Sequence, residues 1–165
     1  MEKQKLYFGK LREGAVIPSK REEDAGYDIY ACFDEDFFLF QPMETRRVPT
    51  GLVSAFSPDY YLQLQERGST GTKGIAQRCG VVDSGFRAEW FIPLTNINSV
   101  PLAIVKKGKE SLFDGQNVVL YPYEKAICQA ILLPVPKTEV VELSPEEIQK
   151  MPSLRSMGEL GSTGK

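Results

Sequence analysis

The sequence of 165 residues contains no histidine, and this absence limits the chemistry that the protein can perform. Ser-His-Asp triads, Cys-His pairs, HExxH zinc sites and histidine proton shuttles are all excluded. Acid–base chemistry must therefore use Asp, Glu, Lys, Tyr or Cys. Asp83 is the strongest candidate, because it follows the apolar pair Val81-Val82 at a turn before a strong strand pattern. A carboxylate held there could accept a proton from water, although a structural Asx turn explains the same Asp more simply.

A second candidate is the loop over residues 66–74, which contains three glycines, three hydroxyl side chains, Arg67 and Lys73. Glycines allow backbone N–H groups to face an anion, and the hydroxyls add donors. The loop lacks the GxxxxGK[ST] spacing, so it is not an ordinary ATP-binding P-loop, and a plain surface loop is an equal alternative. The sequence Gly-Ser-Thr-Gly occurs at 68–71 and again at 161–164. Two such stretches suggest a polyphosphate ligand held from two sides.

The cysteines predict no disulfide framework. Cys32, Cys79 and Cys128 are an odd number, lie far apart and form no CxxC pair. This pattern favours reduced thiols in a cytoplasmic protein. The N-terminal segment lacks an apolar signal stretch, and the longest apolar runs, such as residues 130–133, are too short to span a bilayer. We therefore expect no contact with a membrane.

Length and charge favour a single globular domain that acts on a small ligand. A chain of 165 residues fits one domain, and its 20 basic and 22 acidic residues give a net charge of −2. This balance argues against a protein that coats nucleic acid electrostatically. It does not argue against a small anionic substrate, because a few local Arg or Lys side chains suffice to bind one.

The elements that must position these residues are predicted to be short β-strands. Residues 60–65 alternate, with Tyr60, Leu62 and Leu64 on one face, and residues 88–94 alternate in the same way. Further candidate strands are residues 27–32, 37–40, 51–56, 102–105, 117–121 and 125–133. This spacing indicates an all-β sandwich, barrel or jelly roll. One helix is predicted over residues 144–150, with a capping Ser, Pro at its first position and Glu at its third.

Five segments, taken in order, resemble the five motifs of the trimeric dUTPase family (deoxyuridine 5′-triphosphate nucleotidohydrolase). They are residues 23–28, 66–74, 80–89, 125–131 and 155–164. The resemblance implies a jelly-roll-like β-barrel subunit that forms a homotrimer with three active sites at its subunit interfaces. It also implies a β-domain over residues 1–152 and a flexible C-terminal arm over 153–165 that closes over an active site.

The resemblance further implies a reaction and a set of site residues. The family cleaves dUTP to dUMP and pyrophosphate with Mg²⁺, and Asp83 would activate the water that attacks the α-phosphorus. The residues implied near the phosphates are Arg67, Gly68, Ser69, Lys73, Gln129, Arg155, Ser162 and Thr163. Those implied near the nucleoside are Gln77, Gly80, Val82, Asp83, Phe86 and Leu160, with uracil read largely by the backbone of the hairpin over residues 74–86. Asp28 and Gln129 would act on the metal through water.

The sequence departs from the family pattern at several positions. The usual Arg-Ser-Gly of the second motif is Arg67-Gly68-Ser69 here, so the serine comes one place later. Phe86 replaces the usual Tyr beneath the deoxyribose and keeps an aromatic face without a hydroxyl. Leu160 replaces the aromatic residue that stacks on uracil, and it cannot stack as a flat ring. The usual Gly-Gly pair of the arm is Gly158-Glu159, which implies weaker closure of the arm.

Two alternatives remain beside this interpretation. A dCTP deaminase of the same superfamily would need a Glu on the strand after Asp83, but the corresponding position is Pro93, which cannot act as an acid or base. A trimeric binding or regulatory protein of the same fold is the other alternative. The longer surface loop over residues 106–116 could bind a regulatory protein of unknown identity, although a solvated loop is the simpler interpretation.

Overall fold

A computed structural model describes residues 4–153 of the chain. The chain divides into two compact units, Met1–Val135 and Pro136–Lys165. The sequence instead predicts a boundary between residues 152 and 153, at the edge of the described part, and this boundary stays a prediction.

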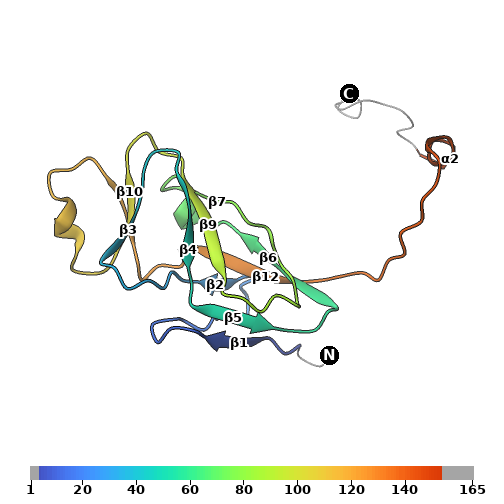
Figure 1. Cartoon of the computed structure of the whole chain (residues 1–165), viewed down its shortest axis with the longest axis horizontal. Coiled ribbons are helices and arrows are strands. Elements are labelled where there is room, and N and C mark those ends of the chain that lie inside the picture. The colour runs from blue at the N-terminus through green and yellow to red at the C-terminus, as the bar shows by residue number, and fades with distance from the viewer. Residues whose placement is uncertain (1–3, 154–165) are drawn as a thin grey trace. The chain divides into compact units, whose positions relative to one another are not determined.

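Among the described residues of the first unit, nearly all regular elements are β-strands, which confirms the all-β prediction. Among the described residues the strands are β1 (Tyr7–Lys10), β2 (Tyr27–Ile29), β3 (Phe37–Phe40), β4 (Thr45–Pro49), β5 (Leu52–Ala55), β6 (Tyr60–Gln65), β7 (Ile75–Gln77), β8 (Val81–Val82), β9 (Phe91–Asn96), β10 (Leu102–Val105), β11 (Val119–Pro122) and β12 (Cys128–Pro134). They form four small sheets, β1-β5, β11-β10-β3, β2-β12-β6-β8 and β4-β9-β7 (Figure 1). The β10-β11 pair is parallel and the other pairs are antiparallel.

Alternation along β6 and β9 supplies much of the core. Leu62 and Leu64 are buried, and Tyr60 packs against the same cluster, as the alternating pattern predicts. The strand predicted over residues 88–94 begins later, at Phe91, so this boundary was wrong. Trp90 precedes the strand and is buried, because its backbone N–H donates to Leu52 O and its indole Nε1 donates to Ser54 Oγ.

A second apolar cluster lies over the sheet β11-β10-β3. The loop predicted over residues 106–116 forms a short 3₁₀ turn, η1 (Glu110–Phe113). Phe113 is buried beside Ala103 and Val105, and its ring lies edge-on to Phe37 with centroids 5.0 Å apart. The loop is therefore exposed along most of its length, but one aromatic side chain fixes it to the strands beneath.

The second unit contains the predicted helix, α2 (Pro145–Gln149), and its capping box is confirmed. Glu147 N donates to Ser144 Oγ at 3.2 Å, and Ser144 N donates to Glu147 Oε2 at 2.9 Å. Within residues 4–153, neither α2 nor the single-turn helix α1 (Gly68–Gly71) is long and apolar enough to cross a membrane.

Candidate active site

Sheet register brings three of the predicted motif segments together. Asp28 on β2 lies opposite Gln129 on β12, and Gln129 lies opposite Gln65, the last residue of β6. The chain then leaves β6 through Glu66, whose carbonyl accepts a hydrogen bond from Gln129 Nε2 at 2.9 Å. Three segments that are distant in sequence therefore meet where these paired strands lie side by side, at the end of β6.

Arg67 links these segments. Its Nε lies 3.0 Å from Asp28 Oδ1, and its Nη2 donates to Asp28 Oδ2 at 3.4 Å. Its Nη1 lies 3.3 Å from Ser69 Oγ and 3.4 Å from Ala126 O. The Arg67 and Asp28 side chains are 29% and 33% exposed, so both can be reached by a ligand. A cation with several donors beside a hydroxyl is a suitable group for binding phosphate oxygens.

The loop after Arg67 forms the single helical turn α1, which the sequence analysis missed. Thr70 creates this turn, because its buried hydroxyl accepts from Arg67 N at 3.1 Å and donates to Arg67 O at 2.8 Å. A side chain at Gly68 or Gly71 would meet no atom within 4 Å, so the backbone here is open. Ser69 Oγ also lies 3.4 Å from the hydroxyl of Tyr121.

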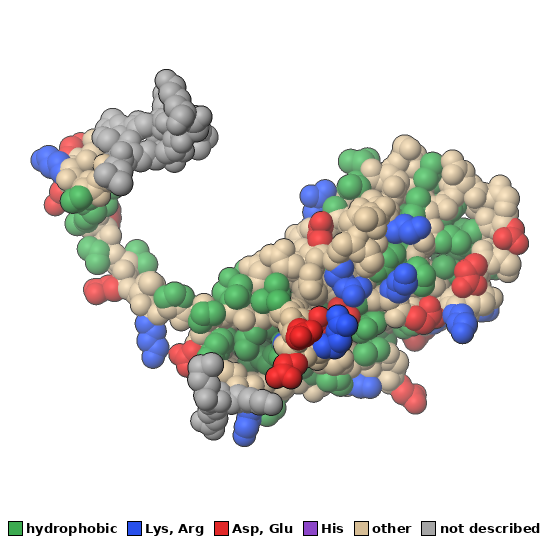
Figure 2. Space-filling model, turned by 180° about the vertical axis from the view of Figure 1, so that it is seen from behind, with side chains coloured by type: hydrophobic (Ala, Val, Ile, Leu, Met, Phe, Trp, Pro, Cys, Tyr) green, Lys and Arg blue, Asp and Glu red, His purple; other side chains and the backbone are tan. Residues whose placement is uncertain are grey.

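Two cavities are both lined by the Asp28–Arg67 ion pair. The larger, of about 660 Å³, lies beside residues 19–26 and Gln129. The smaller, of about 320 Å³, contains Ser69 and residues 124–126. Figure 2 shows acidic and basic side chains next to one another on one face of the first unit.

The loop that borders the larger cavity is held by its own ion pair. Arg21 Nε lies 2.9 Å from Asp24 Oδ2, and the hydrogen bond from Arg21 lowers the pKa of the Asp24 carboxyl. Lys20 Nζ donates to Asp24 O at 2.6 Å. Gly26 is required at the end of this loop, because a Cβ there would lie 2.5 Å from Gln129 Oε1.

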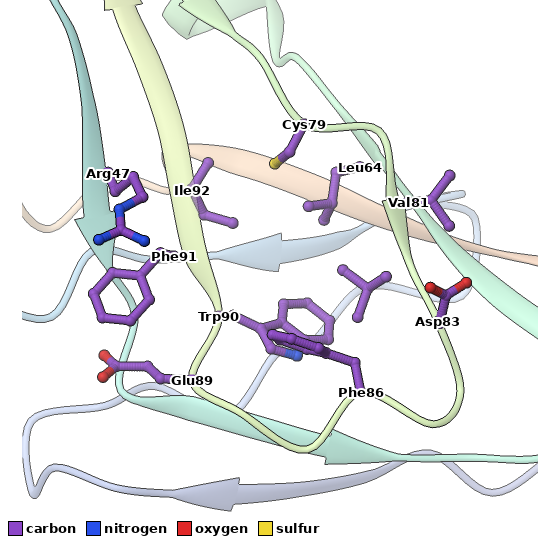
Figure 3. Close-up of a pocket in the computed structure, with 11 residues that line it drawn as sticks. Arg47, Leu64, Cys79, Val81, Asp83, Phe86, Glu89, Trp90, Phe91 and Ile92 are labelled. Carbon is purple, nitrogen blue, oxygen red and sulfur yellow. The ribbon is translucent and has the colours of Figure 1, made fainter.

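A separate, mainly apolar pocket of about 280 Å³ contains Asp83 and Phe86 (Figure 3). Phe86 points toward Trp90 across this pocket, and Asp83 lies at its edge. The other lining residues are Arg47, Leu64, Cys79, Val81, Val82, Glu89, Phe91 and Ile92. Aromatic and aliphatic walls with a carboxylate at the rim suit the flat base and sugar of a nucleoside.

Asp83 begins a turn, as the sequence predicts. Phe86 N donates to Asp83 O at 3.1 Å, which closes the turn over residues 83–86. This bond uses the Asp83 carbonyl and leaves its carboxylate available. Within residues 4–153, no hydrogen bond or ion pair occupies the Asp83 carboxylate, so it is not consumed by an Asx turn.

Several other predicted residues lie outside these cavities. Gly80 O accepts from Leu64 N at 2.8 Å, which fixes the hairpin to β6. The Gln77 amide donates to the Cys79 carbonyl and to its Sγ, at 3.1 Å from the sulfur. Lys73 is exposed and lines none of the three cavities above. Arg155, Leu160, Ser162 and Thr163 lie outside the described residues.

The sequence analysis also missed Arg87. Its guanidinium donates to two carbonyls within the turn over residues 83–86, those of Ser84 and Phe86, and to Ser54 O on β5. Arg87 lies within the motif segment over residues 80–89, but its bonds to backbone carbonyls could not be predicted from residue types alone.

The described residues contain no protein cage for a metal ion. Within residues 4–153, no group of three or more His, Cys, Asp or Glu side chains is arranged to hold one. Burial raises the pKa of the Cys79 and Cys128 thiols, which disfavours thiolate ligands or nucleophiles. The Asp28 carboxylate beside the Gln129 amide instead suits a hard cation that keeps its waters and takes its other oxygen ligands from a substrate.

The two cavities lined by Asp28 and Arg67 share no lining residue with the apolar pocket that contains Asp83. The described part of one chain therefore places Asp28, Arg67, Ser69 and Gln129 together, and it places Asp83, Val82 and Phe86 together. It does not bring the two groups into one cavity.

Comparison with known proteins assigns the chain to a family. The sequence model of the dUTPase family matches residues 12–109. A deoxyuridine 5′-triphosphate nucleotidohydrolase of Neisseria meningitidis is 32% identical over 159 residues, which cover 93% of this chain and 91% of that protein. One from Leptospira interrogans is 36% identical over 97 residues, and this stretch spans 56% of this chain and 66% of that relative's length.

Solved structures agree in fold. A mutant dUTPase of Staphylococcus bacteriophage 80alpha with dUpNHpp superposes with a TM-score of 0.76 at 17% identity and covers 98% of this chain and 99% of that chain. A mutant dUTPase from phage phi11 of S. aureus, described with a structural Mg(II) ion, gives a TM-score of 0.68 at 21% identity and covers 84% of this chain and 96% of that chain. The match of the family's sequence model to more than half of the residues, together with these relatives, shows that the chain belongs to the dUTPase family.

Proposed function

We propose that this member of the dUTPase family hydrolyses dUTP to dUMP and pyrophosphate at sites formed between copies of the chain. The observation that carries the proposal is the Asp83 carboxylate, which has no partner within residues 4–153 and lies at the rim of a pocket built from Phe86 and Trp90. The apolar walls take the base and sugar, and the carboxylate faces the position where the phosphate chain begins.

Asp83 acts as the general base. It accepts a proton from a water molecule while the water oxygen bonds to the α-phosphorus of dUTP. The bond from that phosphorus to the oxygen that bridges the α- and β-phosphates then breaks, and pyrophosphate leaves with the electron pair. The water therefore supplies one oxygen to dUMP, and its proton passes through Asp83 to solvent.

Arg67 and Ser69 bind the phosphate chain, with the open backbone at Gly68 adding an N–H donor. Lys73 lies at the end of the same turn and adds positive charge. Gln129 and Asp28 would hold waters of a bound Mg²⁺, and the charge of that ion would stabilise the departing pyrophosphate. Arg155, Ser162 and Thr163 of the C-terminal arm, with Leu160 over the base, complete the site in this proposal.

We further propose that the protein is a homotrimer, which the separation of the two groups of residues supports. The pocket of Asp83 and the cavities of Arg67 share no lining residue, and this supports a site in which neighbouring copies bring the two groups to one substrate. Three equivalent contacts around a closed ring give three such sites. We also propose a cytoplasmic location, which the free state of Cys32, Cys79 and Cys128 supports.

One assay tests the reaction. The full-length protein is incubated with dUTP and Mg²⁺, and released pyrophosphate is measured, with dCTP run beside it. Pyrophosphate from dUTP and no ammonia from dCTP is the expected result. Ammonia from dCTP would instead indicate a deaminase, which Pro93 on β9 argues against because it offers no acid or base. No pyrophosphate from dUTP would refute the proposal.

A further inference from the structure

The guanidinium of Arg87 connects the Asp83 turn to a neighbouring strand. Its Nη1 lies 2.6 Å from Ser84 O, 3.2 Å from Phe86 O and 3.1 Å from Ser54 O. Two of these carbonyls belong to the turn over residues 83–86, and the third belongs to β5. One cationic group therefore joins the turn to a strand that is paired with β1.

The turn has little other support. Its own backbone contributes the bond from Phe86 N to Asp83 O. At Gly85, an added Cβ would meet no atom within 4 Å, so the tip of the turn is open. β8, which leads into the turn, has only two residues and pairs with β6 at Leu62 and Gln63. A short strand and an open tip leave the position of the turn dependent on the contact with Arg87.

Ser54 accepts hydrogen bonds from Arg87 and from Trp90, a wall of the apolar pocket. Its carbonyl accepts from Arg87, which holds the turn, and its hydroxyl accepts from Trp90 Nε1 at 3.2 Å. Trp90 is itself a wall of the pocket and is 2% exposed. Ser54 of β5 is therefore bonded both to Arg87, which holds the turn, and to Trp90, which forms a wall of the pocket. These two bonds tie the turn and the wall to the same residue.

Arg87 also contributes to a groove on the surface of β1 and β5. Arg87 lines a small, mainly apolar groove of about 250 Å³ with Tyr7, Phe8, Gly9, Val53 and other residues of β1 and β5. Long charged side chains commonly pack their stems on apolar surface in this way. A stem packed along this groove would limit the movement of the head group that bonds to the turn.

We propose that Arg87 is a positioning residue for the hydrolysis of dUTP. It holds the Asp83–Phe86 turn against β5, so that the carboxylate that accepts the proton and the ring beneath the sugar keep their places. This inference rests on the proposed roles of Asp83 and Phe86. Arg87 does not touch the reacting atoms and acts only through the turn.

The decisive variant is Arg87→Met, because methionine keeps a long apolar stem for the groove and removes every donor. A displacement of about 1 Å at a reacting group can lower a rate on the order of 10²-fold, so we expect kcat to fall by about 10- to 100-fold. KM for dUTP should rise only a few-fold, since Phe86 and Trp90 still form the pocket. Arg87→Lys should recover part of kcat, because an ammonium can still donate to some of the three carbonyls.

The matched control is Arg46→Met. Arg46 also donates from its guanidinium to a backbone carbonyl, that of Leu39, but it packs on Phe38 and lines none of the cavities of the site. Its kcat should equal that of the wild type. Steady-state kinetics are measured by pyrophosphate release, and thermal melting is followed for all four proteins, so that rates are compared per folded molecule.

The outcomes separate this inference from the proposed function. If the wild type releases no pyrophosphate, the proposed function fails. If the wild type is active and Arg87→Met has the same kcat, or loses activity only in proportion to its unfolded fraction, the inference alone fails. If Arg87→Met does not fold, Arg87→Lys decides: a lower kcat in the folded protein supports positioning, and an unchanged kcat overturns it.

Discussion

Asp83 differs from two other carboxylates of the site in its surroundings. Asp28 is paired with Arg67 and Asp24 is paired with Arg21, whereas no ion pair holds Asp83 within residues 4–153. A carboxylate held by a cationic partner is already occupied, whereas the Asp83 carboxylate can contact a water molecule directly. The sequence pattern and the geometry therefore select the same residue as the proton acceptor.

Replacement of Asp83 tests this assignment. Asp83→Asn keeps the shape and size of the side chain and removes its ability to accept a proton. We expect kcat to fall by at least ~10²-fold, the usual contribution of a general base. Binding of a non-hydrolysable imido analogue of dUTP, measured by calorimetry, should persist. Unchanged turnover in the Asn variant would remove Asp83 from the mechanism.

Phe86 governs the choice between deoxyribose and ribose in this proposal. A ring packed against C2′ leaves no partner for a 2′-hydroxyl, and burying an unpaired hydroxyl costs ~1–3 kcal/mol, or ~5–150-fold in preference. Phe86→Tyr should be nearly neutral, because both rings offer the same face. Phe86→Ala should weaken dUTP binding and narrow the preference for dUTP over UTP, measured as kcat/KM for both nucleotides. If the Ala variant kept the full preference, the backbone of residues 80–83 would be the discriminating group.

At the scale of elements, the pairing of β2 with β12 places the Asp28 and Gln129 side chains side by side, and it depends on one glycine. A Cβ at Gly26 would lie 2.5 Å from Gln129 Oε1 and 3.0 Å from Gln129 Cβ. The second of these atoms belongs to a central strand and cannot move away easily. The Gln129 amide therefore has its present position only while residue 26 carries no side chain.

Gly26→Ala should disturb both stability and phosphate binding. Overpacking of this kind costs about 1–3 kcal/mol, so we expect a lower urea midpoint with an unchanged slope. The affinity for the imido analogue should also fall, because Gln129 would lose its bond to Glu66 O. Gly71→Ala is the control, since a Cβ there meets nothing within 4 Å, and its midpoint should equal that of the wild type. Equal midpoints for both variants would contradict the argument.

The sequence predicted the elements whose residues alternate or whose caps are local. The prediction of β6 was correct because its side chains alternate between neighbouring positions. The prediction of α2 was correct because its Ser144–Glu147 capping box is formed by residues three positions apart. α1 was missed, since Gly-Ser-Thr-Gly has poor helix propensity and its turn depends on the Thr70 hydroxyl. β4 was missed because its sequence, Thr-Arg-Arg-Val-Pro, offers a single aliphatic residue that is buried, Val48.

The chemistry of the site was easier to predict than its geometry. The exclusion of histidine and the choice of Asp83 needed only residue types and local pattern. To predict that Asp28 lies opposite Gln129, one must know the register of β2 against β12. That register is set by packing between segments more than 100 residues apart in the chain. The bonds of Arg87 to carbonyls depend on the path of β5, which no local pattern specifies.

At the scale of the whole molecule, the separation of the two groups of residues makes a prediction about assembly. Sedimentation should report three copies per particle. Truncation before Arg155 should leave this particle size unchanged and strongly depress catalysis, because the arm residues implied at the phosphates would be lost. A fully active monomer, or an undiminished rate after truncation, would contradict the proposed arrangement.

A mixing experiment shows directly whether neighbouring chains share a site. Asp83→Asn removes the base, and Arg67→Ala removes the main phosphate cation, so each variant alone should be nearly inactive. If Asp83 and Arg67 of one site come from different copies, unfolding and refolding an equal mixture should create some sites with both residues intact. Random assembly into a closed trimer gives such a site with a probability of roughly one quarter, so the mixture should regain roughly a quarter of the wild-type rate. The two variants refolded separately and then combined are the control, and their activity should stay low while the trimers do not exchange subunits. An equally low rate in the co-refolded mixture would mean that Asp83 and Arg67 serve the same site from one chain, which the separate cavities of the described residues argue against.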